Sequence, residues 1–501
     1  MGRGAGRFAL HRRWLVAGES GLRGVRGAPD GVRSGGYPAG GGCPAPHLCR
    51  PPPASGDPDQ DRPRARLDLL KVGRMRWAAL GLWTAFSVVS LAAGPPTEFF
   101  AYLERTEGEA RWQVGDPRPF GSGELLNIRL HSQTWRGIPW EHPLLLCTPP
   151  TLAVEDVMVL VISGDAGVSD TLLGMSLATR AKLRVAVLPN VPVQPLFGGL
   201  REDALLAYTF QRYLEEGDPD WPLLFPMTRA ALAAMEALAD VAHRAWGIRL
   251  RGFIVTGASK RGWTTYLAAA AAPQRVLAMA PMVFDILDMP RQLAHQQEFW
   301  GQVSPMIHDY TDRGLFEAFQ HSPTGARLAW LVDPYSYRYA YTMPKLIVLG
   351  SNDPYWPVDA LNLYWHGLPD PKLAQIVPNS GHGLEDRERV MDSLAAFARL
   401  IATGEPLPHL EASFSPRAGG VDLAVTASQP PLEARLWTAE SPVRDFREAH
   451  WRASPLAAGE AGFHASLSRP ETGWVAFFAE FVFRVGELSL YLTTPARVLG
   501  P

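Results

Sequence analysis

The stretch FIVTGASKRGW, residues 253–263, passes from apolar residues directly into a turn of small residues that contains one serine. The residues before Gly257 are typical of a buried strand, and the Ala-rich run after Gly262 is typical of a helix. A tight strand–turn–helix connection projects a serine hydroxyl outward, as a nucleophile requires. The usual motif has glycine two residues after the serine, where this chain has Arg261. The stretch is therefore compatible with a nucleophile at Ser259 and with an ordinary connection.

Similar apolar runs alternate with helical patterns from residue 133 to about residue 403. Continuous apolar runs indicate strands that are covered on both faces, as in parallel sheets. Alternation of such strands with helices predicts a doubly wound α/β sheet, whose ligands lie at the carboxyl ends of the strands. The runs are residues 141–149, 155–164, 181–190, 250–259, 275–285, 344–353 and 372–382.

Two further segments do not follow the alternation of strands and helices. The first, residues 289–341, is too long for a simple crossover. Its aromatic and proline content predicts either a cap over the sheet edge or a purely structural helical excursion. From residue 404 to residue 501 the apolar residues alternate with period two between glycines and prolines, which predicts a small antiparallel β-sandwich-like domain. The α/β domain is thus expected over residues 95–403.

The first residues have a different composition. Residues 1–74 are dominated by Gly, Arg, Pro and Ala, and we interpret them as disordered or as a misassigned start. Met75 and Arg76 precede an apolar run that ends in small residues near position 93, which predicts a signal peptide over residues 75–94. A signal anchor is the alternative, and only that alternative predicts contact with a membrane. Removal of the signal would make the protein secreted or periplasmic.

Composition restricts the remaining classes. A net charge of −2 gives no electrostatic reason to expect nucleic acid as a partner. Cys147 is the one cysteine after the leader, which excludes an internal disulfide framework there. No phosphate-binding glycine loop, HExxH pair or carboxylate metal loop occurs, so we expect neither a metal nor another cofactor. The oligomeric state stays open.

Three side chains after three separate strands have the types and the chain order of a hydrolase triad. Ser259 is followed by Asp353 in VLGSNDPYWPVD and then by His382 in PNSGHGL. A histidine can accept the serine proton, and a carboxylate can hold the imidazole in the required tautomer. Serine, acid and histidine in this order match an α/β-hydrolase. Asp285 is the alternative acid, and we expect Asp359 to begin or cap the following helix.

An oxyanion hole requires backbone N–H groups close to the nucleophile. We expect one from Lys260 and a second from Asp165 or Ala166, in the loop after the strand at 155–164, although that loop could be a plain turn. The side chains of Lys260 and Arg261 could attract an anionic substrate or could simply be solvated.

At this point longer stretches resemble the PhoPQ-activated pathogenicity-related protein family. The resemblance spans roughly residues 97–498 and implies an exported α/β-hydrolase whose motifs map onto Ser259, Asp353 and His382. It implies contexts such as virulence and extracellular signalling, but no substrate. Its most specific stretches are SQTWRGIPWEH, PNVPVQPL, REDALLAYTF, GDPDWPLLFPMTRAALAAMEAL, VTGASKRGWTTYLAAA, VDPYSYR, PKLIVLGSNDPYWPVDAL and VPNSGHGL.

Two hypotheses follow. The first is an exported serine hydrolase, of the esterase or the peptidase and amidase type, that acts on a small-molecule ester or peptide through an acyl-enzyme. The second is a secreted, non-catalytic binding or signalling protein on the same scaffold, since a fold does not determine a function.

Overall fold

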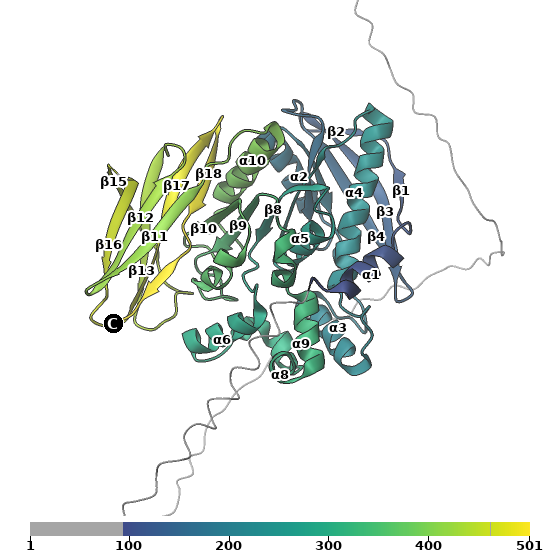
Figure 1. Ribbon diagram of the computed structural model, residues 1–501. Helices are drawn as coiled ribbons and strands as arrows, with labels where there is room; N and C mark the ends of the chain where they lie inside the picture. The colour runs from purple at the N-terminus through teal and green to yellow at the C-terminus, as the bar shows by residue number, and fades with distance from the viewer. Residues whose placement is uncertain (1–93, 461) are drawn as a thin grey trace, which may run out of the picture. The chain divides into compact units, whose positions relative to one another are not determined.

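A computed structural model describes residues 94–460 and 462–501. The predictions for residues 1–74 and for the signal sequence lie outside these residues, apart from Gly94. Within them, a mixed sheet is flanked by helices, and a second, four-stranded antiparallel sheet packs near the C-terminus (Figure 1). The fold class expected from the sequence, an α/β-hydrolase-like sheet with a helical insertion and C-terminal antiparallel strands, is therefore confirmed.

Six parallel strands form the centre of the large sheet. Alternate residues of each strand enter different cores: Met158 and Leu160 face one cluster, whereas Val159 and Val161 face the other. Burial on both faces explains why these strands read as continuous apolar runs. In spatial order the strands are β6 (Arg184–Leu188), β5 (Val157–Ile162), β7 (Gly252–Ala258), β8 (Val276–Met282), β9 (Lys345–Gly350) and β10 (Lys372–Val377).

An antiparallel flank extends the sheet beyond β6. Only its innermost strand was predicted, because the others are short or alternate between buried and exposed residues and so lack a continuous apolar run. The flank consists of β4 (Ile138–Thr148), β3 (Gly123–Trp135), β1 (Arg111–Val114) and β2 (Arg118–Phe120).

Helices cover both faces of the sheet (Figure 1). Buried residues of α2 and α10 join one core, and those of α1, α3, α4 and α5 join the other. These helices are α1 (Thr97–Arg105), α2 (Val168–Ala181), α3 (Glu202–Glu216), α4 (Leu224–Trp246), α5 (Lys260–Ala271) and α10 (Arg387–Thr403).

The segment between β8 and β9 is helical. Together with α3 it gathers at one end of the sheet (Figure 1). It contains α6 (Met289–Trp300), η2 (Pro305–Ile307), α7 (His308–Thr311), α8 (Leu315–His321), α9 (Pro323–Val332) and η3 (Pro334–Ala340). Two short turns, η4 (Ala360–Leu363) and η5 (Trp365–Gly367), follow between β9 and β10.

The C-terminal strands form two layers around an apolar interior. One layer continues the large sheet, because β18 pairs with β10 in antiparallel fashion at Ala374 and Thr493. Phe463 and Phe481 meet between the layers with their ring centroids 5.0 Å apart. The first layer holds β13 (Glu433–Ser441), β14 (Arg452–Pro455), β17 (Trp474–Val485), β18 (Leu488–Thr493) and β19 (Arg497–Leu499), and the second holds β11 (Leu410–Arg417), β12 (Gly420–Ala427), β15 (Ala457–Gly459) and β16 (Gly462–Ser468).

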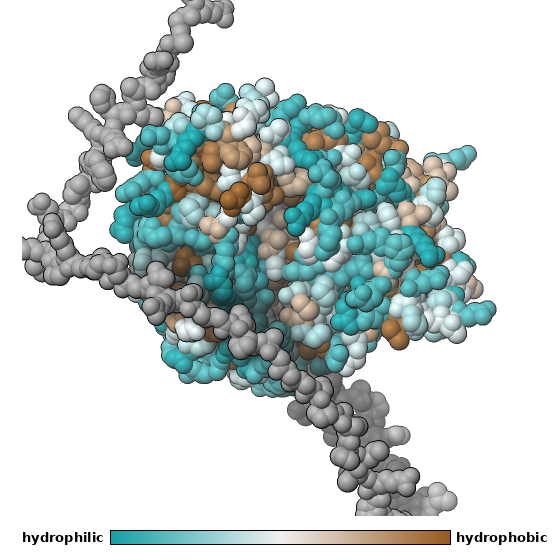
Figure 2. All heavy atoms as spheres, turned by 180° about the vertical axis from the view of Figure 1, so that it is seen from behind, coloured by the Kyte–Doolittle hydropathy of each residue, from teal (hydrophilic) through white to brown (hydrophobic). Residues whose placement is uncertain are grey.

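The surface seen from behind is mixed. Figure 2 shows apolar patches interrupted by hydrophilic side chains on that face. Among the helices of residues 94–501, position 461 excepted, none has both the length and the apolar character needed to cross a membrane.

Candidate active site

Ser259 occupies the turn between β7 and α5 in a strained backbone conformation. Its φ of 58° and ψ of −127° lie outside the favoured regions for a residue with a side chain. The turn is held by hydrogen bonds from the Ser259 N–H to the Met282 carbonyl (2.9 Å) and from the Trp263 N–H to the Ser259 carbonyl (3.0 Å). Strained residues of this kind cluster at functional sites, where the surrounding structure maintains them.

Close backbone approaches explain the positions of the two glycines. A Cβ on Gly257 would lie 2.7 Å from the Arg261 carbonyl oxygen, and a Cβ on Gly262 would lie 2.8 Å from the Met282 carbonyl oxygen. Helix α5 packs against the end of β8 at Gly262, and this close contact leaves no space for a side chain. The chain therefore needs a glycine three residues after the serine. Arg261, in the usual glycine position, extends its side chain to Glu202 and to the Val191 carbonyl.

The three predicted residues meet at the carboxyl ends of their strands. The Ser259 hydroxyl lies 3.0 Å from His382 Nε2, and His382 Nδ1 lies 2.8 Å from Asp353 Oδ2. The Asp353 side chain is 4% exposed and that of His382 is 23% exposed. Serine, imidazole and carboxylate therefore form a continuous hydrogen-bonded chain that begins at a partly accessible rim.

Tyr355 supports both the acid and the imidazole, and sequence reasoning missed it. Its N–H donates to Asp353 Oδ1 at 2.9 Å, and its ring stacks on the His382 ring with centroids 4.2 Å apart. The N–H contact could have been anticipated, because an Asp side chain often accepts from the backbone two residues later. The stacking joins residues from two loops, and no local pattern predicts it.

The other carboxylates have different surroundings. Asp285 is 3% exposed and its Oδ1 has no hydrogen-bond partner. Burial raises the pKa of Asp285 to about 8, and the negative charge of Asp353 acts in the same direction. Asp359 precedes η4, but its side chain makes no capping bond and instead lies 2.7 Å from His295 Nε2. The expectation that Asp359 begins the following turn holds, whereas a side-chain cap does not form.

The loop after β5 contains Asp165 and Ala166, the two candidates for the second oxyanion donor. The Ala166 N–H already donates to Asn190 Oδ1 at 3.2 Å. The Asp165 carboxylate accepts from Gln194 Nε2 at 2.8 Å and pairs with Arg201. Among the residues that the structure describes, the Asp165 N–H donates to no acceptor. Of the two candidates, Asp165 is therefore the one with a free N–H in this part of the chain. Lys260 begins α5, so its N–H has no intrahelical acceptor.

The cationic side chains after Ser259 are neither solvated nor free to attract an anion. Lys260 Nζ lies 2.9 Å from Glu202 Oε2 and 3.2 Å from Asp203 Oδ2, and Lys260 is 7% exposed. Arg261 forms a bidentate pair with Glu202 at 2.6 and 2.7 Å and donates to the Val191 carbonyl. Although burial opposes ionisation of Glu202, the hydrogen bonds from Arg261 hold the pKa of Glu202 well below its usual range. These ion pairs link the turn at Ser259 to the start of α3.

No cluster of three or more potential metal ligands occurs in residues 94–460 or 462–501.

The sheet topology and flanking helices define an α/β-hydrolase fold. Residues 99–447 match the model of the PhoPQ-activated pathogenicity-related protein family, and the chain belongs to that family. The chain is 29% identical over 421 residues to the autocrine proliferation repressor protein A of Dictyostelium discoideum, covering 76% of this chain and 84% of that protein.

Solved structures with a similar arrangement include two hydrolases. Acetyl xylan esterase 1 from Thermoanaerobacterium sp. is 15% identical with a TM-score of 0.41, covering 60% of this chain and 94% of that chain. An S-formylglutathione hydrolase from Agrobacterium tumefaciens is 13% identical with a TM-score of 0.38, covering 58% of this chain and 99% of that chain.

Proposed function

We propose that this protein is a serine hydrolase that cleaves an ester or amide through an acyl-enzyme. The observation that carries the proposal is the contact of His382 Nε2 with the Ser259 hydroxyl at 3.0 Å, together with the Asp353 contact at Nδ1. A serine hydroxyl is a weak nucleophile unless an adjacent base accepts its proton.

The steps follow from these contacts. Ser259 Oγ attacks the substrate carbonyl while His382 Nε2 takes its proton, and Asp353 stabilises the imidazolium. The N–H groups of Lys260 and Asp165 stabilise the oxyanion. His382 then returns the proton to the leaving group, which departs as the acyl–Ser259 bond remains. Water, deprotonated by His382, then attacks the acyl carbonyl carbon. The bond to Ser259 Oγ breaks, His382 returns the proton to Ser259, and the carboxylic acid leaves.

A fluorophosphonate probe tests the nucleophile without knowledge of the substrate. We expect wild type to be labelled covalently and Ser259→Ala to show no labelling above background. Ser466→Ala is the matched control, because Ser466 lies on β16 and donates to Asp422, away from the triad. Absence of labelling in folded wild type would favour the non-catalytic binding protein.

Substrate class requires a second measurement. A panel of p-nitrophenyl esters and peptidyl amides, each compared with Ser259→Ala, would separate esterase from amidase activity. Turnover that persists in the alanine variant would contradict the proposed mechanism.

We further propose export to the cell exterior or periplasm. The support is the basic and then apolar sequence of residues 75–94. The N-terminal residue of the exported protein tests it: a start near Pro95 is expected after cleavage, whereas retention of residues 77–93 would exclude cleavage.

A further inference from the structure

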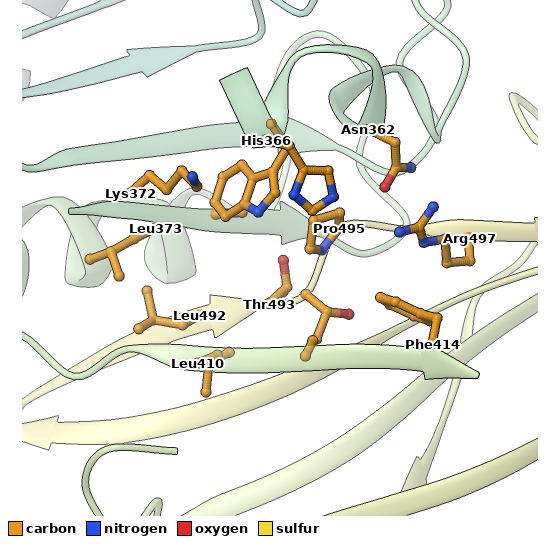
Figure 3. Close-up of a pocket in the computed structure, with 14 residues that line it drawn as sticks. Asn362, His366, Lys372, Leu373, Leu410, Phe414, Leu492, Thr493, Pro495 and Arg497 are labelled. Carbon is orange, nitrogen blue, oxygen red and sulfur yellow. The ribbon is translucent and has the colours of Figure 1, made fainter. Parts of the chain in front are cut away.

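A cavity lies where the C-terminal strands join the central sheet. Strands β10 and β18 pair at Ala374 and Thr493 and then separate, and η5 and β11 close the resulting gap. The cavity measures about 70 Å³ and is partly open to solvent. Figure 3 shows side chains that line it. Its lining includes Trp365 and Phe414 and does not include Ser259 or His382. The cavity is thus separate from the proposed catalytic site.

Arg497, at the start of β19, lines this cavity without a counterion. Its guanidinium lies over the Phe414 ring, 4.4 Å from the centroid, and its Nε is buried without a hydrogen-bond partner. No carboxylate of residues 94–460 or 462–501 forms an ion pair with it, and Asp359 is already bonded to His295. Burial lowers the pKa of Arg497, which reflects the cost of holding this charge away from water.

Apart from His366 and Trp365, the other polar side chains that line the cavity already have partners. Lys372 Nζ donates to the Leu368 carbonyl at 2.8 Å and lies 3.6 Å from Asp370. The Thr493 hydroxyl accepts the Ile376 N–H at 3.1 Å. Asn362 donates to the Asp359 and Ala496 carbonyls. Of the two permanently cationic side chains that line the cavity, Lys372 is therefore paired, and Arg497 is the one without a counterion among the described residues.

We propose that this cavity binds a small monocarboxylate through Arg497. A planar guanidinium matches a carboxylate with two parallel hydrogen bonds, and one charge on the ligand balances one on the protein. Apolar side chains line the remainder and accommodate a short hydrocarbon tail: they include Leu373, Leu410 and Leu492 (Figure 3). The volume of the cavity limits the ligand to a carboxylate with only a few carbon atoms.

Fluorine NMR of 3,3,3-trifluoropropionate, titrated with full-length protein at constant ionic strength, tests the proposal. We expect saturable line broadening that unlabelled propionate reverses and that propionamide does not. Arg497→Gln should weaken binding at least tenfold. Arg484→Gln should bind like wild type, because Arg484 is an exposed residue of the adjacent strand β17. Inorganic phosphate should compete more weakly than propionate, since its second charge has no partner.

Equal binding by wild type and Arg497→Gln would overturn the proposal, as would equal competition by propionamide or stronger competition by phosphate. If Arg497→Gln fails to fold, a crystal of wild type soaked in propionate decides the question. Density for a carboxylate beside Arg497 supports the site, and an empty cavity at saturating propionate refutes it. Density only beside Ser259 would assign the binding to the proposed catalytic site and would also refute it.

Discussion

The loops after β8 and β9 each place an aspartate three residues beyond the end of the strand, but they give the two carboxylates opposite environments. Asp285 and Asp353 are 3% and 5% exposed and line the same cavity of about 10 Å³. Asp353 receives hydrogen bonds from His382 and from the Tyr355 N–H, whereas Asp285 Oδ1 receives none. The position at the sheet edge therefore gives two candidates for the acid that orients His382. Their hydrogen-bond partners distinguish between them and favour Asp353.

Asp353→Asn should have the largest effect. An amide can orient His382 in the wrong tautomer and cannot stabilise the imidazolium, which reduces turnover by about 10⁴-fold in enzymes with such a triad. The second-order rate of fluorophosphonate labelling should fall by a similar factor, and this measurement does not require a known substrate.

Asp285→Asn is the matched control for that experiment. Its labelling rate should stay within about twofold of wild type, because Asp353, and not Asp285, is the carboxylate hydrogen-bonded to His382 Nδ1. The opposite result, with the Asp285 variant slow and the Asp353 variant fast, would reverse the roles assigned to the two loops.

Replacement of Tyr355 should have an intermediate effect. Tyr355→Leu removes the ring that stacks on His382, and such aromatic pairs contribute about 0.5–1.5 kcal/mol, which corresponds to a rate loss of roughly two- to tenfold. Tyr355→Phe retains the ring and should label at nearly the wild-type rate. An equally slow Phe variant would show that the hydroxyl, and not the stacked ring, supports the imidazole.

The parallel centre of the sheet and the meeting of Ser259, Asp353 and His382 can both be predicted from the sequence, and for the same reason. Strands buried on both faces produce continuous apolar runs, and Ser259, Asp353 and His382 directly follow three such runs. Strand β3 escapes prediction because its residues alternate in burial, and the pairing of β18 with β10 is a contact between residues far apart in the chain.

The partners of the candidate site are less predictable than its members. Glu202 lies 58 positions before Lys260, and only the folded chain shows that it forms ion pairs with Lys260 and Arg261. The stacking of Tyr355 on His382 likewise depends on the positions of two separate loops.

Asp285→Asn should have the smallest effect on activity. It should also change the stability of the protein, and this change should depend on pH. The pKa of Asp285 is raised to about 8 in the folded protein, above the value near 4 of an unfolded chain. Between these values the folded state binds more protons, so this carboxyl lowers the free energy of unfolding by up to about 1.4 kcal/mol for each pH unit gained.

Asparagine does not titrate, so the variant should gain stability relative to wild type as the pH increases from 5 to 8. Denaturant unfolding of both proteins at these two pH values measures the difference and cancels the contributions of other titrating groups. A constant difference would mean that Asp285 has the same proton occupancy in the folded and unfolded states. Its loop would then provide a partner for the ionised carboxylate, and the contrast with the loop of Asp353 would not hold.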